Sequence, residues 1–238
     1  LFRSPPYIRA ARTSKIDVWG FLLLMIWVGS LQVVLDKGQQ DDWLASGFIR
    51  TLVCTGCIGL VLFIFREFMT SAPLVNLRVL GNRNFAVGVL LMTLMGGVLY
   101  GSIALLPLFL QTLMGYSAYQ SGLTTSPRGF GSVVGMILIG RIMGILDSRF
   151  LIALGFIIVA WSTWAFGAIN LDVTSGSITW PNIYNGFGTA LIFVPLTTLA
   201  MGTLKNEQMG NATGIFNLMR NLGGGVGIAL VTTLLARG

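Results

Sequence analysis

The sequence lacks histidine entirely and contains few charged residues of either sign. Only 10% of its 238 residues are charged, whereas 54% are hydrophobic. A typical soluble domain carries about 25% charged residues. Without histidine the chain has neither the commonest metal ligand nor the commonest general base. The composition therefore argues against a soluble domain and against an enzyme, and we expect no cofactor and no metal.

Cysteine is scarce as well, with two residues, Cys54 and Cys57, in one CxxC pair. A single CxxC is a weak indication of a metal or redox site. Because the pair lies inside an apolar run, buried and unreactive thiols are the favoured interpretation.

Long apolar runs, by contrast, fill most of the chain. An α-helix of about 20 apolar residues crosses a bilayer, and the runs here reach that length. The predicted fold class is therefore all-α: a polytopic membrane helical bundle with about seven transmembrane helices. The predicted spans are residues 17–35, 49–65, 85–112, 120–146, 150–169, 180–201 and 213–236.

Basic residues give the chain a net charge of +7, and they alternate with the spans. With residues 1–15 placed inside the cell, only Lys37, Arg50 and Arg237 fall on the outside. This is the positive-inside pattern of membrane proteins, so we expect no nucleic-acid partner. The basic residues placed inside are Arg3, Arg9, Arg12, Lys15, Arg66, Arg78, Arg83, Arg141, Arg149 and Lys205.

The last predicted span contains an arginine at membrane depth. Arg220 lies between Asn217 and Asn221 and is followed by a glycine-rich run, 223–227. Because an arginine at the bilayer centre costs about 2.5–3.5 kcal/mol on insertion scales, it must face the bundle interior, a partner or water. Arg220 is either a binding or coupling residue in a polar path or a packing residue that bonds backbone carbonyls. Asn217 and Asn221 either line that path or bond between helices.

Further polar residues and prolines interrupt the other spans. Arg128 either snorkels to the membrane surface, which is the favoured alternative, or lines the path. Pro107 and Pro195 are predicted to bend their helices. Three amide side chains either line the path or bond between helices: Gln111, Gln120 and Asn185.

A charged corner joins the fourth and fifth predicted spans, at Gly140, Arg141, Asp147 and Arg149. It is either a gate with ion pairs that break on opening, or charge that only sets the orientation of the chain. No predicted span contains a carboxylate at depth, although a proton relay normally needs one.

Four stretches together resemble the fourteen-span drug:proton antiporters of the EmrB/QacA type, in the major facilitator superfamily. The stretches extend along nearly the whole chain and occur in the family's order. They are SLQVVLDKGQQDDW (30–43), LLPLFLQTLMGYSAYQSGL (105–123), SPRGFGS (126–132) and ATGIFNLMRNLGGGVGIALVTTLLAR (212–237).

The resemblance implies a fragment of a longer protein that covers about spans 7–13. Residues 1–15 would be a cytoplasmic linker, and residues 16–70 two extra transmembrane helices between the transporter halves. Residues 71–238 would be most of the C-terminal half, with five transmembrane helices. The corner at Gly140, Arg141, Asp147 and Arg149 resembles a degenerate copy of the superfamily's cytoplasmic gate loop.

The same resemblance implies export of small amphipathic, drug-like compounds by proton antiport with alternating access, across the inner or plasma membrane. The expected substrate-pathway or coupling residues are Arg220, Asn217, Asn221, Gln111, Asn185 and Arg128. A cationic drug is not attracted to Arg220, which favours a packing, gating or coupling role for this residue, or an anionic substrate.

Three alternatives stay open: a narrow exporter of an anionic metabolite, a membrane-embedded enzyme, and an accessory membrane subunit. The expected partners are the small-molecule substrate, protons and membrane lipid. In a Gram-negative cell a periplasmic adaptor and an outer-membrane channel would join them.

Overall fold

The computed structural model describes residues 17–70, 74–168 and 175–237, so the predicted linker 1–15 lies outside the described residues. Every regular element among them is a helix, and six helices are long and apolar enough to cross a membrane. The predicted all-α membrane bundle is thereby confirmed. The chain divides into two compact units, residues 1–78 (unit 1) and 79–238 (unit 2).

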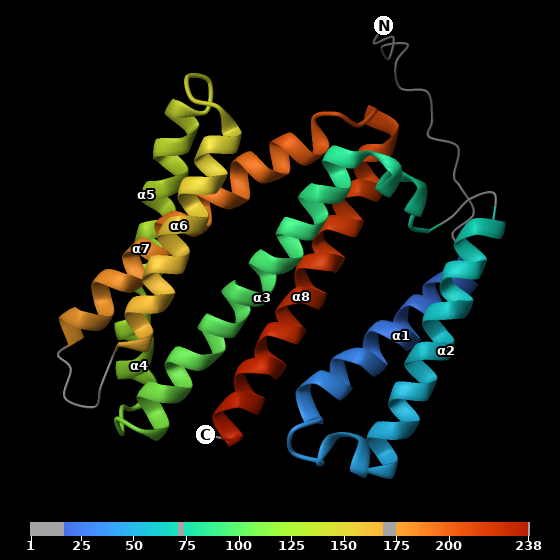
Figure 1. Cartoon of the computed structure of the whole chain (residues 1–238), viewed down its shortest axis with the longest axis horizontal. Coiled ribbons are helices and arrows are strands. Elements are labelled where there is room, and N and C mark those ends of the chain that lie inside the picture. The colour runs from blue at the N-terminus through green and yellow to red at the C-terminus, as the bar shows by residue number, and fades with distance from the viewer. Residues whose placement is uncertain (1–16, 71–73, 169–174, 238) are drawn as a thin grey trace, which may run out of the picture. The chain divides into compact units, whose positions relative to one another are not determined.

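Unit 1 contains a helical hairpin of α1 (Val18–Lys37) and α2 (Gly47–Met69), joined by a short 3₁₀ turn, η1 (Trp43–Ala45) (Figure 1). Asp17 caps α1 by accepting a hydrogen bond from the backbone N–H of Gly20 at 3.1 Å. Arg66, near the end of α2, donates to the same carboxylate at 2.9–3.1 Å. These donors hold the pKa of Asp17 below its usual range. The start of α1 is therefore fastened to the end of α2.

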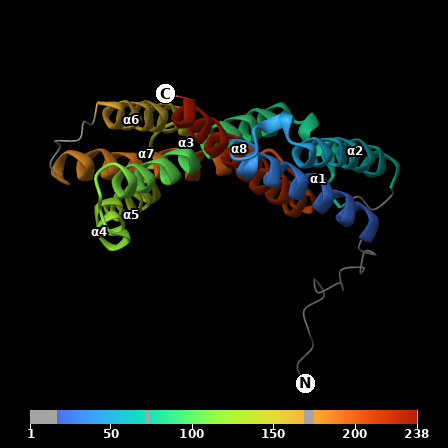
Figure 2. The same ribbon diagram turned by 90° about the horizontal axis from the view of Figure 1, so that it is seen from below.

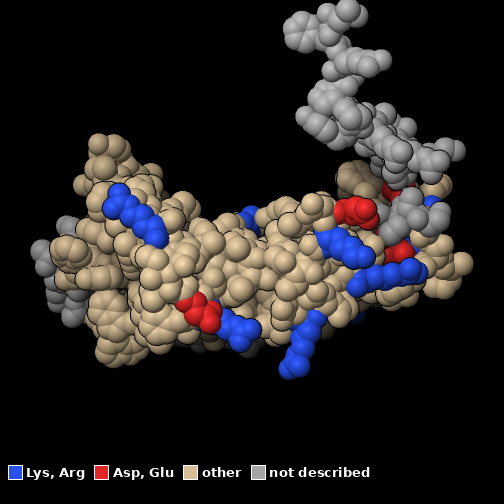
Figure 3. Space-filling view, turned by 90° about the horizontal axis from the view of Figure 1, so that it is seen from above, with Lys and Arg blue, Asp and Glu red and all other residues tan. Residues whose placement is uncertain are grey.

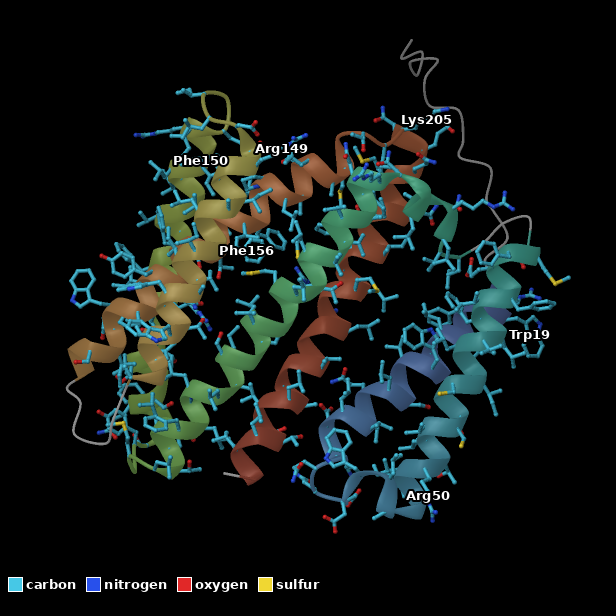
Figure 4. The ribbon with its side chains drawn as sticks, in the orientation of Figure 1. Trp19, Arg50, Arg149, Phe150, Phe156 and Lys205 are labelled. Atoms are coloured by element: carbon cyan, nitrogen blue, oxygen red, sulfur yellow. The ribbon has the colours of Figure 1, made fainter. Side chains whose placement is uncertain are left out.

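The outer surface of this hairpin is apolar. Trp19 is 68% exposed, and it lies at the opposite end of the hairpin from Arg50 (Figure 4). Cys54 and Cys57 are free thiols on exposed positions of α2, so the prediction that they are buried is wrong. In a membrane helix an exposed apolar side chain meets lipid rather than water, and an apolar run does not imply burial in protein.

Helix α2 also extends beyond its predicted end at residue 65 and includes Glu67. Glu67 is only 6% exposed. Its Oε2 accepts from the backbone N–H of Val75 at 3.2 Å, and its Oε1 has no hydrogen-bond partner among the described residues. The expectation that no span buries a carboxylate is therefore wrong for α2. The sequence-based span ended at the first charge, Arg66, but Asp17 neutralises that charge through the fold.

Unit 2 is a bundle in which α3 and α8 lie side by side (Figure 1), and α7 lies between α5 and α6 (Figure 2). Helix α3 also packs against α7. The candidate residues of the sequence all lie in this unit. Its helices are α3 (Arg83–Thr112), α4 (Ala118–Thr125), α5 (Pro127–Ile142), α6 (Ser148–Gly167), α7 (Ser175–Met201) and α8 (Met209–Arg237), with a short 3₁₀ turn η3 (Asn206–Gln208). A further 3₁₀ turn, η2 (Leu77–Gly81), spans the boundary between the two units.

The fourth predicted span, residues 120–146, is divided into α4 and α5, which corrects the expectation of seven continuous spans. Proline has no N–H, so Pro127 cannot donate to the carbonyl of Leu123 one turn earlier. The Ser126 hydroxyl donates to that carbonyl instead, at 2.9 Å. Helix α4 begins with a capping box in which Gln120 and Ser117 bond each other's backbone N–H groups. Gln120 thus caps α4, and a role for it in the pathway stays a prediction.

Glycines set the contact distance between the helices of unit 2. A Cβ atom added to Gly96 of α3 would collide with the backbone carbonyl of Arg220 on α8, and one added to Gly227 of α8 would collide with the backbone of Gly97. On α7, a Cβ atom at Gly186 would collide with the carbonyl of Arg128 on α5. Small residues let membrane helices approach to backbone contact, so these glycines position both interior arginines.

We expect Gly227→Ala to destabilise the protein, because its new methyl group has to push α8 away from α3. Overpacking of this kind costs roughly 1–3 kcal/mol. The matched control is Gly210→Ala in the same helix, where an added Cβ meets nothing. Unfolding in SDS measures both variants, and equal stability of the two would contradict this account of the α3–α8 contact.

We expect Asp17→Asn to loosen the first turn of α1 at neutral pH. Because the pKa of Asp17 is lowered by folding, its stabilising effect is present above the unfolded-state pKa of about 3.9 and is lost as the pH falls through the folded-state pKa. Hydrogen exchange of residues 18–24, compared at matched pH, should be faster in the variant at pH 7, with the difference disappearing in acid. Asp36→Asn, an exposed site in the same helix, is the control that should behave as wild type at every pH.

Candidate functional site

Arg128 forms the central contact of a polar group that joins three helices of unit 2. Its Nε donates to Asn185 Oδ1 on α7 at 3.0 Å, and its Nη2 donates to the same oxygen. Nη2 also donates to Ser102 Oγ on α3 at 2.7 Å. Arg128 is half-buried and points into the bundle, which does not match the snorkelling interpretation. We call Arg128, Asn185 and Ser102 the arginine cluster.

Local features of the chain place these side chains. The start of α5 at Pro127 puts Arg128 in the first helical turn. The close approach at Gly186 brings the α7 backbone against Arg128, and Ser132 Oγ bridges the two helices, 3.1 Å from the Arg128 carbonyl and 3.2 Å from the Gly186 carbonyl. Asn185 is only 1% exposed. Its Nδ2 is buried and has no hydrogen-bond partner among the described residues.

Arg220 has a different set of neighbours. Its guanidinium lies over the ring of Phe193 on α7, with Cζ 5.6 Å from the ring centroid. Its Nε is buried, and within the described part of the chain it has no hydrogen-bond partner. The aromatic face supplies electrostatic attraction to the charge but no hydrogen-bond acceptor of the usual strength.

The two asparagines beside Arg220 make contacts of their own. Asn217 donates to the Thr213 carbonyl of its own helix at 3.0 Å, and Asn221 Oδ1 accepts from the Tyr100 hydroxyl at 3.4 Å. Both are exposed in the described chain, whereas Arg220 turns toward α7. At 3.6 residues per turn, Arg220 lies about 60° around the helix axis from Asn217 and about 100° from Asn221. The structure therefore does not bring the three residues into one hydrogen-bonded group.

The remaining pathway candidate, Gln111, has no hydrogen bond to either arginine among the described residues. Gln111 is exposed, and its Nε2 is 3.5 Å from Ser121 Oγ, at the limit of hydrogen bonding. Helices α3 and α7 continue through Pro107 and Pro195. Bending at these prolines stays a prediction.

The charged corner lies at one end of unit 2, where Arg149 and Lys205 are both found (Figure 4). Seen from above, scattered basic and acidic side chains stand out from a surface that is otherwise uncharged (Figure 3). Asp147 caps α6 by accepting from the Arg149 backbone N–H at 2.9 Å. Among the described residues, neither Arg141 nor Arg149 forms an ion pair with Asp147. A gate at this corner stays a prediction.

Sequence reasoning missed three partners: Ser102, Phe193 and Tyr100. Each belongs to a helix other than the one that carries the polar residue it contacts. Ser102 gave a weak signal as a lone hydroxyl in an apolar run, and the two aromatic residues gave none.

The described part of unit 2 includes two apolar cavities. The larger, of about 750 Å³, is bounded by α3, α6 and α8, and the smaller, of about 470 Å³, by α5, α6 and α7. None of the pathway residues predicted from the sequence lines either cavity, but Ser102 of the arginine cluster lines the larger one.

Comparison with known proteins assigns the family. A profile for the Major Facilitator Superfamily matches residues 18–228. The chain belongs to the major facilitator superfamily. The predicted EmrB/QacA-type resemblance is confirmed, and so is a multi-pass protein of the inner or plasma membrane. The superfamily points to a transporter rather than an enzyme.

The chain is similar to several named exporters and resistance proteins. It is 38% identical to "Fatty acid resistance protein FarB" of Neisseria gonorrhoeae, over 93% of this chain and 44% of that protein. It is 34% identical to "Multidrug export protein EmrB" of Escherichia coli (strain K12), over 95% of this chain and 45% of that protein. It is 29% identical to "Colistin resistance protein EmrB" of Acinetobacter baumannii, over 98% of this chain and 46% of that protein. The chain thus spans about half the length of these relatives.

The contact between Arg220 and Phe193 predicts a measurable coupling. In a double-mutant cycle of Arg220→Gln and Phe193→Leu, we expect a coupling energy of about 0.5–2 kcal/mol in the free energy of unfolding. Phe187→Leu on the same helix, where the ring packs against other apolar side chains, should be additive with Arg220→Gln. Additivity in both cycles would show that the stacking contributes nothing.

Proposed function

We propose that the full-length protein exports small amphipathic, drug-like compounds by proton antiport with alternating access. The observation that carries this proposal is the superfamily match along residues 18–228, together with relatives named as multidrug export proteins. The arrangement of unit 2 supports it, because two arginines inside apolar helices are costly unless they face a polar path or a partner.

The packing of unit 2 suits such a mechanism. Alternating access requires a bundle that moves as a body around a site near the midplane. Backbone contacts at Gly96, Gly186 and Gly227 hold the helix pairs at fixed distances. The exposed amides of Asn217 and Asn221 would border the path or the rest of the protein, because an amide facing lipid is unfavourable.

Proton coupling and partner proteins belong to the proposal as well. Glu67 is the carboxylate that the described chain buries within a span, but it belongs to unit 1, whereas the candidate residues belong to unit 2. We place the proton-carrying groups in the remainder of the protein. An adaptor and an outer-membrane channel would apply only if the cell is Gram-negative.

A narrower function, export of an anionic compound, is favoured by one observation. The interior of unit 2 holds two arginines, and among the described residues neither forms an ion pair. One relative is named a fatty acid resistance protein. A positively charged interior attracts anions and disfavours cations, so an anionic amphiphile is the second candidate substrate class.

Export can be tested by following ethidium accumulation in energised cells that produce the full-length protein, with and without a protonophore. We expect lower accumulation than in empty cells, and we expect the protonophore to abolish the difference. Arg220→Ala should raise accumulation at equal expression if the residue acts in the mechanism, whereas Arg83→Ala at an exposed site should not. Accumulation equal to that of empty cells would exclude the broad cationic-drug function and leave the anionic alternative.

A further inference from the structure

The arginine cluster has more hydrogen-bond donors than acceptors. A guanidinium carries five N–H donors. Among the described residues, Nε and Nη2 of Arg128 reach Asn185 Oδ1 and Ser102 Oγ, while Nη1 has no hydrogen bond. Asn185 adds a buried and unpartnered Nδ2 beside the arginine. Because a buried polar group without a partner is costly, such groups are rare in folded proteins. The missing element is an acceptor.

Among the described residues of unit 2, the cluster also has a positive charge without a counter-charge. Beyond Arg78 the sequence contains only three carboxylate side chains, Asp147, Asp172 and Glu207. Asp147 caps α6 beyond the far end of α5, so roughly 20 Å of helix separates it from Arg128. Glu207 is exposed in the turn between α7 and α8, and Asp172 lies outside the described residues. The described part of unit 2 therefore offers no anion to Arg128.

Ser102 connects the cluster to an apolar space. Its hydroxyl accepts from Arg128 Nη2 at 2.7 Å, and the same residue lines the cavity of about 750 Å³ between α3, α6 and α8. Besides Ser102, the polar lining residues are Thr93 and Thr163, and the others are apolar. Ser102 thus lies between the charged donor group of Arg128 and a cavity that suits a hydrocarbon or aromatic body.

We propose that Arg128, Asn185 and Ser102 form a binding site for the carboxylate of an amphipathic anion, whose apolar part lies in the adjoining cavity. Nη1 of Arg128 has two N–H groups that make no hydrogen bond among the described residues, and hydrogen bonds between a charged donor and a carboxylate are stronger than those between neutral groups. The Asn185 amide supplies an additional donor. This assignment rests on the proposed transport function and narrows the substrate class to amphipathic anions.

The test uses the purified full-length protein in lipid nanodiscs at neutral pH. The probe is dansyl-labelled undecanoic acid, and its primary amide is the uncharged match. We expect the wild-type protein to bind the acid more tightly than the amide. Arg128→Gln should weaken binding of the acid by roughly 10- to 100-fold, the loss typical of a charged hydrogen-bonding group, and should leave binding of the amide unchanged. Arg83→Gln, at an exposed arginine of the same unit, should match wild type.

Asn185→Asp provides a second, independent variant. Its new carboxylate would pair with Arg128 inside the bundle and exclude the carboxylate of the probe, so we expect the same selective loss while the positive charge is kept. If Arg128→Gln fails to fold, this variant decides the question, and an unchanged preference for the acid would overturn the proposal.

Other outcomes also contradict the site. Equal weakening of acid and amide in Arg128→Gln would show that Arg128 only packs the helices. Equal binding of the two probes by wild type would show that the cluster does not accept the carboxylate of a ligand. This is the result expected if a carboxylate side chain from another part of the protein already pairs with Arg128. Binding is measured without a proton gradient. A negative binding result therefore does not contradict proton-driven export, and a negative export result does not contradict the carboxylate site.

Discussion

Backbone contact at glycine is the interaction on which unit 2 depends. Lipid tails are as apolar as leucine, so membrane helices gain little hydrophobic energy by associating and rely on close packing. Helices α3 and α8 meet at Gly96 and Gly227, and α7 meets α5 at Gly186. At each of these positions an added methyl group would force the helices apart. The spacing of the helices in unit 2 is thus set by glycines, which have no side chain to keep the backbones apart.

The same contacts place the charged residues. Gly96 lies against the carbonyl of Arg220, and Gly186 lies against the carbonyl of Arg128. Each arginine therefore starts from a backbone position that is fixed against a neighbouring helix. Its side chain then reaches a third element: Arg220 stacks on Phe193, and Arg128 bonds Ser102 as well as Asn185. The same glycine contacts therefore set the distance between the helices and the positions of the two interior arginines.

The two interior arginines differ in what their surroundings offer a ligand. Arg220 is partly neutralised by the face of an aromatic ring, which supplies no hydrogen-bond acceptor of normal strength. Arg128 is held by two neutral oxygens, beside a buried amide with a free donor and a large apolar cavity. A packing or coupling role fits Arg220, whereas recognition of an anion fits Arg128.

Several features were readable from sequence because they depend on local composition. Apolar runs of sufficient length predicted the membrane helices, and four ordered stretches predicted the superfamily that the comparisons confirm. Arg220 was recognisable as an interior charge. Predictions from local sequence failed where a residue from another helix changes the environment of a charge. Helix α2 continues past Arg66 because Asp17 pairs with that arginine. Arg128 points into the bundle because Asn185 and Ser102 accept its hydrogen bonds there.

The sequence by itself determined that this chain is a helical membrane protein of a known transporter superfamily, since hydropathy and ordered motifs are properties of the chain alone. Only the tertiary structure decided which polar residues meet. Ser102, Arg128 and Asn185 are separated by 26 and 57 positions, and a helix pattern shows which face a residue occupies but not which helix packs there. That choice depends on backbone approach at glycines, which becomes visible only when the helices are placed side by side.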